Sequence, residues 1–69
     1  MPPALTRMFR DGDRITVTDL TDRHSTEVGA VEDWYYGMSG TVHYLVYLDG
    51  RQDWIPFAET QLAYEGEVE

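Results

Sequence analysis

The segment Thr41–Leu48 constrains the fold of this chain most, because its side chains alternate with the period of a β-strand. The alternation predicts one face with Val42, Tyr44, Val46 and Leu48, and another with Thr41, His43, Leu45 and Tyr47. Both faces are apolar enough for a strand in the interior of a sheet. Asp49-Gly50 follows directly and is typical of a two-residue hairpin with positive φ at both central residues. We therefore expect Gln52–Ile55 to pair back on this strand.

An earlier segment, Arg14–Thr18, alternates polar and β-branched residues. This pattern predicts a half-buried strand with Ile15 and Val17 facing inward. Asp19–Thr26 is almost entirely polar, which indicates a surface loop.

The segment Glu27–Trp34 is expected to form the next strand. Strict alternation would place Val28 and Val31 on opposite faces, because they are an odd number of residues apart. A β-bulge at Gly29 would bring both to the same face, and we predict one there. A loop bracketed by glycines, residues 37–40, then leads into the strongest strand.

The C-terminal third begins with a proline that limits strand pairing. Pro56 has no N–H to donate, so the fourth strand either ends there or lies at a sheet edge. The segment Phe57–Leu62 is too short for a stable α-helix and predicts one 3₁₀ turn. A last short strand, Leu62–Tyr64, is expected to follow.

A chain of 69 residues has room for one small domain, and the absence of cysteine excludes disulfides and thiolate metal sites. Five short strands leave two costly edges unless the sheet curls closed. We therefore predict an all-β fold, a small five-stranded SH3-like barrel with one 3₁₀ turn before the last strand. The expected organisation is a flexible N-terminal arm (residues 1–8), the barrel (9–64) and an acidic C-terminal tail (65–69).

Four short blocks carry a resemblance to a known family: Gly12–Val17, Val28–Val31, Tyr44–Leu48 and Phe57–Leu62. They resemble the successive blocks of the small SH3-like barrels related to the ferredoxin-docking subunit of photosystem I and to KOW domains. The resemblance spans about residues 9–64. It implies a noncatalytic role beside a larger partner.

The charge of the chain favours some partners over others. Thirteen carboxylates against five arginines give a net charge of −8, which opposes binding to a phosphate backbone. Nucleic acid is therefore an unfavourable partner and a basic protein a favourable one, and solubility or adaptation to high salt stay open as other reasons for the acidic surface. No apolar stretch approaches the ~18–20 residues of a membrane span, so we expect no membrane association and, without cysteine, a cytoplasmic protein.

The aromatic residues suggest a binding surface. Rings concentrate at the end of one expected strand and on the neighbouring hairpin, beside carboxylates, and such rings attract cations. The candidate partner-binding residues are Trp34, Tyr35, Tyr36, His43, Tyr47, Trp54, Glu32 and Asp33. A second interpretation stays open, in which Trp54 and Tyr44 fill the core and the remaining rings cover a thin sheet.

Metal and catalytic sites are not expected. Turn chemistry accounts for Asp11–Asp13 and Asp49–Asp53, because neither has the ligand spacing of a calcium loop. His24 and His43 lack a cysteine or third histidine for a zinc site, and Ser25 beside His24 lacks an orienting group. We expect no cofactor and no enzymatic activity.

The sequence therefore predicts a noncatalytic protein-interaction module that docks an acidic, aromatic face onto a basic or cationic segment of a larger protein. Two alternatives stay open. One is a KOW-like domain that binds nucleic acid by aromatic stacking. The other is an accessory subunit of an enzyme or electron-transfer complex.

Overall fold

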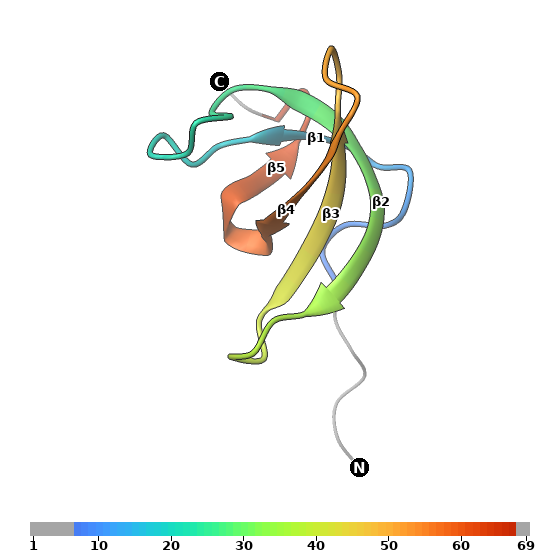
Figure 1. Ribbon diagram of the computed structural model, residues 1–69, viewed down its shortest axis with the longest axis vertical. Helices are drawn as coiled ribbons and strands as arrows, with labels where there is room; N and C mark the ends of the chain where they lie inside the picture. Colours follow the sequence, from blue (N-terminus) through green and yellow to red (C-terminus); the bar gives the residue numbers. More distant parts are fainter. Residues whose placement is uncertain (1–6, 68–69) are drawn as a thin grey trace.

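The computed structural model of the protein describes residues 7–67. This part of the chain forms a five-stranded antiparallel sheet with one 3₁₀ turn before the last strand, which confirms the all-β class. The elements are β1 (Arg14–Val17), β2 (Val28–Tyr36), β3 (Val42–Leu48), β4 (Trp54–Ala58), the 3₁₀ helix η1 (Glu59–Gln61) and β5 (Leu62–Tyr64). Their order across the sheet is β4-β3-β2-β1-β5 (Figure 1).

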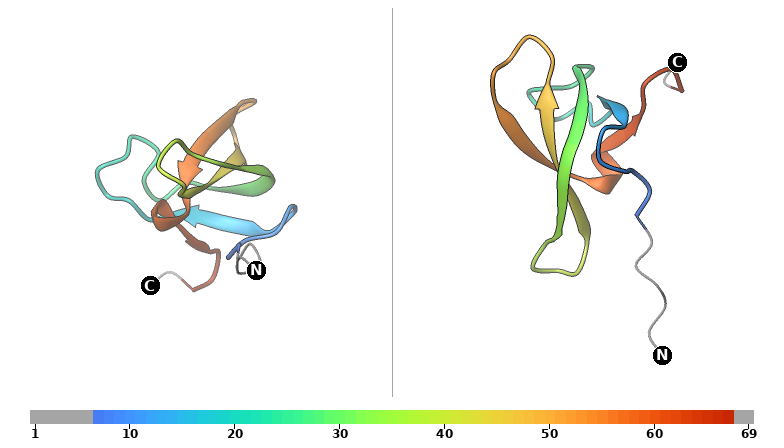
Figure 2. Two further views of the ribbon diagram at one scale, coloured as in Figure 1. Left: turned by 90° about the horizontal axis from the view of Figure 1, so that it is seen from below. Right: turned by 90° about the vertical axis from the view of Figure 1, so that its right-hand side faces the viewer.

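The sheet curls so that β1 and β5 lie across the core from β3 and β4 (Figure 2). Within residues 7–67 no ladder joins β4 to β5, so the sheet is not closed and the expected SH3-like barrel stays a prediction. Apolar side chains from all five strands and from the segment before β1 fill the space inside. These are Phe9, Ile15, Val17, Val31, Tyr44, Val46, Leu48, Phe57 and Leu62.

Strand β3 follows its predicted alternation and lies in the interior of the sheet. Tyr44, Val46 and Leu48 are fully buried, and the residues between them are only half-buried. The two inward residues of β1, Ile15 and Val17, are also fully buried, as predicted.

The β-bulge predicted at Gly29 is wrong, because the register shift of β2 lies between Val31 and Asp33. Gly29 stays in register with Ile15 on one side and Leu48 on the other. A Cβ at Gly29 would lie 2.4 Å from the carbonyl oxygen of Tyr47, so glycine serves here to let β3 approach closely.

The Asp49-Gly50 turn forms, but the predicted two-residue hairpin is wrong. Arg51 N–H donates to the Leu48 carbonyl across the turn (3.2 Å), and only Gly50 has a positive φ, of 77°. Residues 49–53 all lie between β3 and β4. The longer loop lets Arg51 donate two hydrogen bonds to Glu27, at 2.7 and 3.1 Å.

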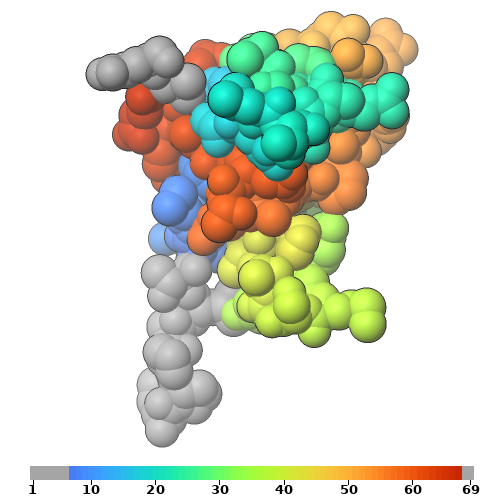
Figure 3. Space-filling model, turned by 90° about the vertical axis from the view of Figure 1, so that its left-hand side faces the viewer, coloured from blue at the N-terminus to red at the C-terminus, as the bar shows by residue number. Residues whose placement is uncertain are grey.

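Strand β4 continues through Pro56 and forms an edge of the sheet, one of the two outcomes predicted for this proline. Phe57 and Ala58 belong to β4, so the 3₁₀ turn is shorter than expected and begins at Glu59. Gln61 Nε2 donates to Asp19 Oδ2 (3.0 Å), and this bond ties the β1–β2 loop to η1. The loop and the segment that contains η1 lie side by side on the surface (Figure 3).

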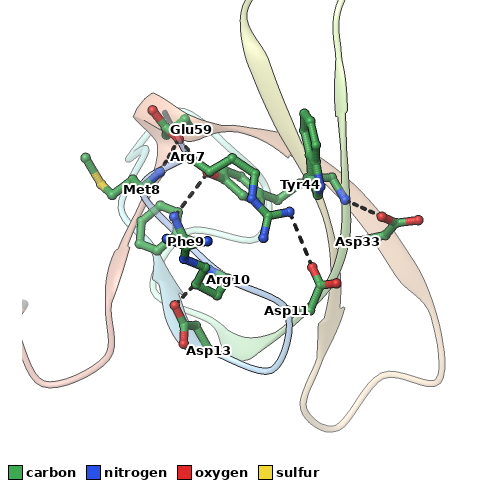
Figure 4. Close-up of polar contacts among 10 residues, drawn as sticks. Arg7, Met8, Phe9, Arg10, Asp11, Asp13, Asp33, Tyr44 and Glu59 are labelled. Atoms are coloured by element: carbon green, nitrogen blue, oxygen red, sulfur yellow. Dashed lines mark hydrogen bonds and ion pairs between the residues drawn. The ribbon is translucent and has the colours of Figure 1, made fainter. Parts of the chain in front are cut away.

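The segment just before β1 closes one side of the core (Figure 4). Phe9 is fully buried, and its N–H donates to the Tyr44 hydroxyl (3.1 Å). The Met8 N–H donates to Glu59 Oε2 (3.0 Å), and the Tyr64 hydroxyl donates to the Met8 carbonyl (2.5 Å). Residues 1–6 of the expected arm and 68–69 of the expected tail lie outside the described residues.

Candidate interaction surface

Strands β2, β3 and β4 present a second face, opposite to the core, on which side chains form three rows. Directly opposite residues of an antiparallel ladder point to the same side of the sheet. The rows run Tyr35–His43–Ala58, Asp33–Leu45–Pro56 and Ala30–Tyr47–Trp54. We call the surface made by Tyr35, His43, Leu45, Pro56, Tyr47 and Trp54 the outer aromatic face.

Two pairs of rings mark the ends of the outer aromatic face. Tyr35 stacks on His43 with ring centroids 5.3 Å apart and an interplanar angle of 19°. Tyr47 and Trp54 meet edge to face, with centroids 5.2 Å apart at 64°. Tyr35 is 43% exposed and Trp54 is 51% exposed. Both pairs therefore offer ring surface to a partner.

His43 is held in position by the loop between β2 and β3. Its Nδ1 lies 3.1 Å from the Thr41 carbonyl oxygen, and since a carbonyl only accepts, Nδ1 carries the proton of this bond. A Cβ at Gly37 would lie 2.5 Å from His43 Cε1, so the ring edge occupies the space that a side chain would take. The stacked position on Tyr35 thus depends on glycine at residue 37.

Three carboxylates lie around the outer aromatic face. Glu32 Oε1 accepts from Trp54 Nε1 (3.3 Å), Asp53 Oδ1 accepts from the Trp54 N–H (2.9 Å), and Asp33 Oδ1 accepts from the Trp34 N–H (2.8 Å). All three residues are exposed. Within residues 7–67 no arginine forms an ion pair with any of them.

Three arginines bind other carboxylates. Arg14, which continues the Ala30 row onto β1, binds Asp49 with two nitrogens and Glu65 with one. Its hydrogen bond lowers the pKa of Asp49 below the ordinary range.

Arg51 forms the second such pair, and Arg7 the third. The hydrogen bond from Arg51 is the main cause of the lowered pKa of Glu27, the residue just before β2. Arg7 lies 3.6 Å from Asp11. These cations are neutralised by partners other than Glu32, Asp33 and Asp53, so the outer aromatic face keeps a negative rim.

Trp34 and Tyr36 do not lie on this face. Trp34 is opposite Tyr44 in the ladder and packs against the core, with Tyr36 5.5 Å away edge to face and the Arg7 guanidinium 4.9 Å over its ring. The structure therefore divides the six predicted rings between two faces. Consecutive residues of a strand point to opposite sides, and this signal was present in the run Trp34-Tyr35-Tyr36.

Leu45, Pro56 and Asp53 belong to the surface although the sequence did not single them out as binding residues. Leu45 and Pro56 form the apolar middle row between the two ring pairs. The alternation of β3 already placed Leu45 beside His43 and Tyr47, whereas the position of Pro56 depends on the β3–β4 register.

Glu59 lines a pocket of about 240 Å³ with Thr41, Val42, Ala58 and Thr60. Its Oε2 accepts hydrogen bonds from Tyr44 Oη (2.5 Å) and the Met8 N–H, so this carboxylate fastens the core to the chain before β1. Burial and the bond to Glu59 raise the pKa of Tyr44.

No group of three or more histidine, aspartate or glutamate residues is placed to hold a metal ion within residues 7–67. No helix in this range is long and apolar enough to cross a membrane.

Comparisons of the chain with protein families, with curated proteins and with solved structures found no match. The resemblance to small SH3-like barrels therefore stays a prediction from the sequence blocks.

Proposed function

We propose that this protein is a noncatalytic interaction module that docks its outer aromatic face onto a basic segment of a larger protein. The observation that carries the proposal is the arrangement of two exposed ring pairs beside Glu32, Asp33 and Asp53, none of which binds an arginine within residues 7–67. Ring faces attract cations, and carboxylates add charge-assisted hydrogen bonds.

The edge of β4 supports docking through side chains instead of strand addition. In an antiparallel ladder alternate residues turn their N–H groups away from the neighbouring strand. On β4 these residues are Trp54, Pro56 and Ala58. Asp53 Oδ1 accepts from the Trp54 N–H, and Gln61 Oε1 accepts from the Ala58 N–H (2.8 Å). Pro56 has no backbone N–H. A strand added here would find no free donor.

The finer fold and setting belong to the same proposal. The five-stranded sheet with a 3₁₀ turn between β4 and β5 supports an SH3-like domain, even though the sheet is open. A cytoplasmic location and an accessory role beside a larger subunit are proposed with it, because the charge and the outer aromatic face suit a basic protein partner.

The proposal is tested by titrating an arginine-serine repeat peptide into the protein while amide NMR shifts are recorded. We expect shifts concentrated on the β2–β4 segments that carry the outer aromatic face, and weaker binding at high salt. Tyr35→Ala and Trp54→Ala should each weaken binding about two- to fivefold. Leu20→Ala is the matched control, since this 83% exposed side chain lies in the β1–β2 loop.

Two outcomes would count against docking at this face. Equal binding by the control and by both aromatic variants would show general attraction to an acidic protein. Tight binding of a single-stranded oligonucleotide at ~50 mM salt, lost in the same aromatic variants, would favour the nucleic-acid alternative.

A further inference from the structure

The spacing of the two ring pairs selects a class of partner sequence within the proposed function. His43 and Tyr47 are four residues apart on β3 and point to the same side. At about 3.3–3.4 Å per residue, the pairs are separated by about 13 Å along the strand. One side chain of a partner cannot reach both pairs.

The row between the pairs has a different chemistry. Leu45 lies opposite Pro56 and contributes apolar surface, while Asp33 completes the row on β2. Pro56 is exposed and Leu45 is half-buried. This row would accept an apolar side chain positioned midway between two cations.

Each ring pair also has a carboxylate close to it. Trp54 has Glu32 and Asp53 as hydrogen-bond partners. Tyr35 has Asp33 two residues before it on the same face of β2. Each end of the surface therefore offers a ring face together with an acceptor for N–H groups. An arginine uses both at once, because its planar guanidinium stacks on a ring while its N–H groups donate in the plane of the guanidinium.

We propose, resting on the function proposed above, that the outer aromatic face binds an extended segment with arginines at positions i and i+4 and an apolar residue at i+2. An extended chain has the same rise per residue as β3, so these three side chains match the two ring pairs and the Leu45–Pro56 row. In an α-helix, residues i and i+4 are only about 6 Å apart along the axis, so a helical partner does not match.

The test compares synthetic peptides of identical composition, flanked by glycine and serine. Their two arginines are placed at i and i+2, at i and i+4, or at i and i+5. Binding is measured by calorimetry with the full chain. We expect the four-residue spacing to bind about two- to fivefold tighter than the others, because only it places both arginines on rings.

Variants of the protein locate the two contacts. In Tyr35→Ala and in Trp54→Ala one ring contact is lost. The peptide with arginines at i and i+4 should therefore bind each variant about as tightly as a peptide with a single arginine binds the unchanged protein. The Leu20→Ala control should keep the full preference for the four-residue spacing.

The outcomes separate the inference from the proposed function. Equal affinity for all three spacings, still lost in the aromatic variants, would overturn the spacing and leave docking at this face intact. Absence of binding by every peptide would overturn both. A preference for the i and i+4 spacing that remains in Tyr35→Ala and Trp54→Ala would overturn the assignment of the contacts to these rings.

Discussion

Replacing Tyr44 with phenylalanine removes one oxygen atom from the junction between the core, η1 and the chain before β1. The Tyr44 ring is fully buried, its hydroxyl donates to Glu59 Oε2, and it accepts from the Phe9 N–H. The variant keeps the ring and its edge-to-face contact with Phe9, whose centroid lies 5.2 Å away. The perturbation is therefore confined to two hydrogen bonds.

The expected loss of stability depends on which polar groups lose their hydrogen-bond partner. A hydrogen bond to a charged group contributes about 1.5–3 kcal/mol, and a buried N–H left without an acceptor costs about 1–3 kcal/mol. Glu59 keeps its bond from the Met8 N–H, which limits the penalty on the carboxylate. We expect the free energy of unfolding to fall by about 2–4 kcal/mol. For a domain of this size Tm should fall by roughly 10–25 °C.

The assay is urea unfolding followed by far-ultraviolet circular dichroism, with two matched controls. Tyr64→Phe removes the hydroxyl that binds the Met8 carbonyl and should cost no more than about 1.5 kcal/mol. Tyr35→Phe removes an exposed hydroxyl and should change stability by less than about 0.5 kcal/mol. If Tyr44→Phe were as stable as Tyr35→Phe, the Tyr44–Glu59 contact would contribute nothing to the fold and the reasoning would be refuted.

Three further predictions concern the sheet and its charges. Gly29→Ala should lower the free energy of unfolding by about 1–3 kcal/mol in urea, because the new Cβ would collide with the backbone of β3; an unchanged midpoint would contradict this close approach. The lowered pKa of Glu27 means that its pairing with Arg51 stabilises the fold above the unfolded pKa, and this contribution is lost as the pH falls through the folded pKa. Urea midpoints measured between pH 7 and pH 3 should therefore fall less steeply in Arg51→Gln than in the unchanged protein. Parallel curves would exclude the Glu27–Arg51 pair as a source of the pH dependence. Pro56→Ala restores an N–H on the outer edge of β4 and should increase self-association in sedimentation experiments, whereas a strictly monomeric variant would show that the edge is protected by something else.

Several features of the fold were predictable from local sequence. The alternation of Thr41–Leu48 correctly predicted an interior strand and both of its faces, since a period of two depends only on the residues of that strand. Pro56 predicted that the fourth strand either ends there or lies at a sheet edge, because proline has no N–H, and the structure has the second outcome. The turn at Gly50 and the 3₁₀ turn before Leu62 were also predicted, although their observed boundaries differ from the predicted ones by one to three residues.

The candidate site was predictable only in part. The sequence indicated the ring-rich strands, but treated Trp34, Tyr35 and Tyr36 as one group with the rings of the hairpin. The bulge between Val31 and Asp33 decides which of them face the core, and it depends on how β2 pairs with β3. No property of β2 alone placed the bulge there, and the glycine at residue 29 suggested the wrong position.

By itself, then, the sequence determined the strand content, the limit that Pro56 sets on strand pairing and the acidic charge, because these follow from local periodicity, a missing N–H donor and composition. Only the tertiary structure decided which rings share a face and which carboxylates bind arginine. Arg14 meets Asp49 and Glu65, and Trp54 meets Glu32, across long stretches of chain. Such pairings depend on strand register, and register is set by the packing of the whole core rather than by any one segment.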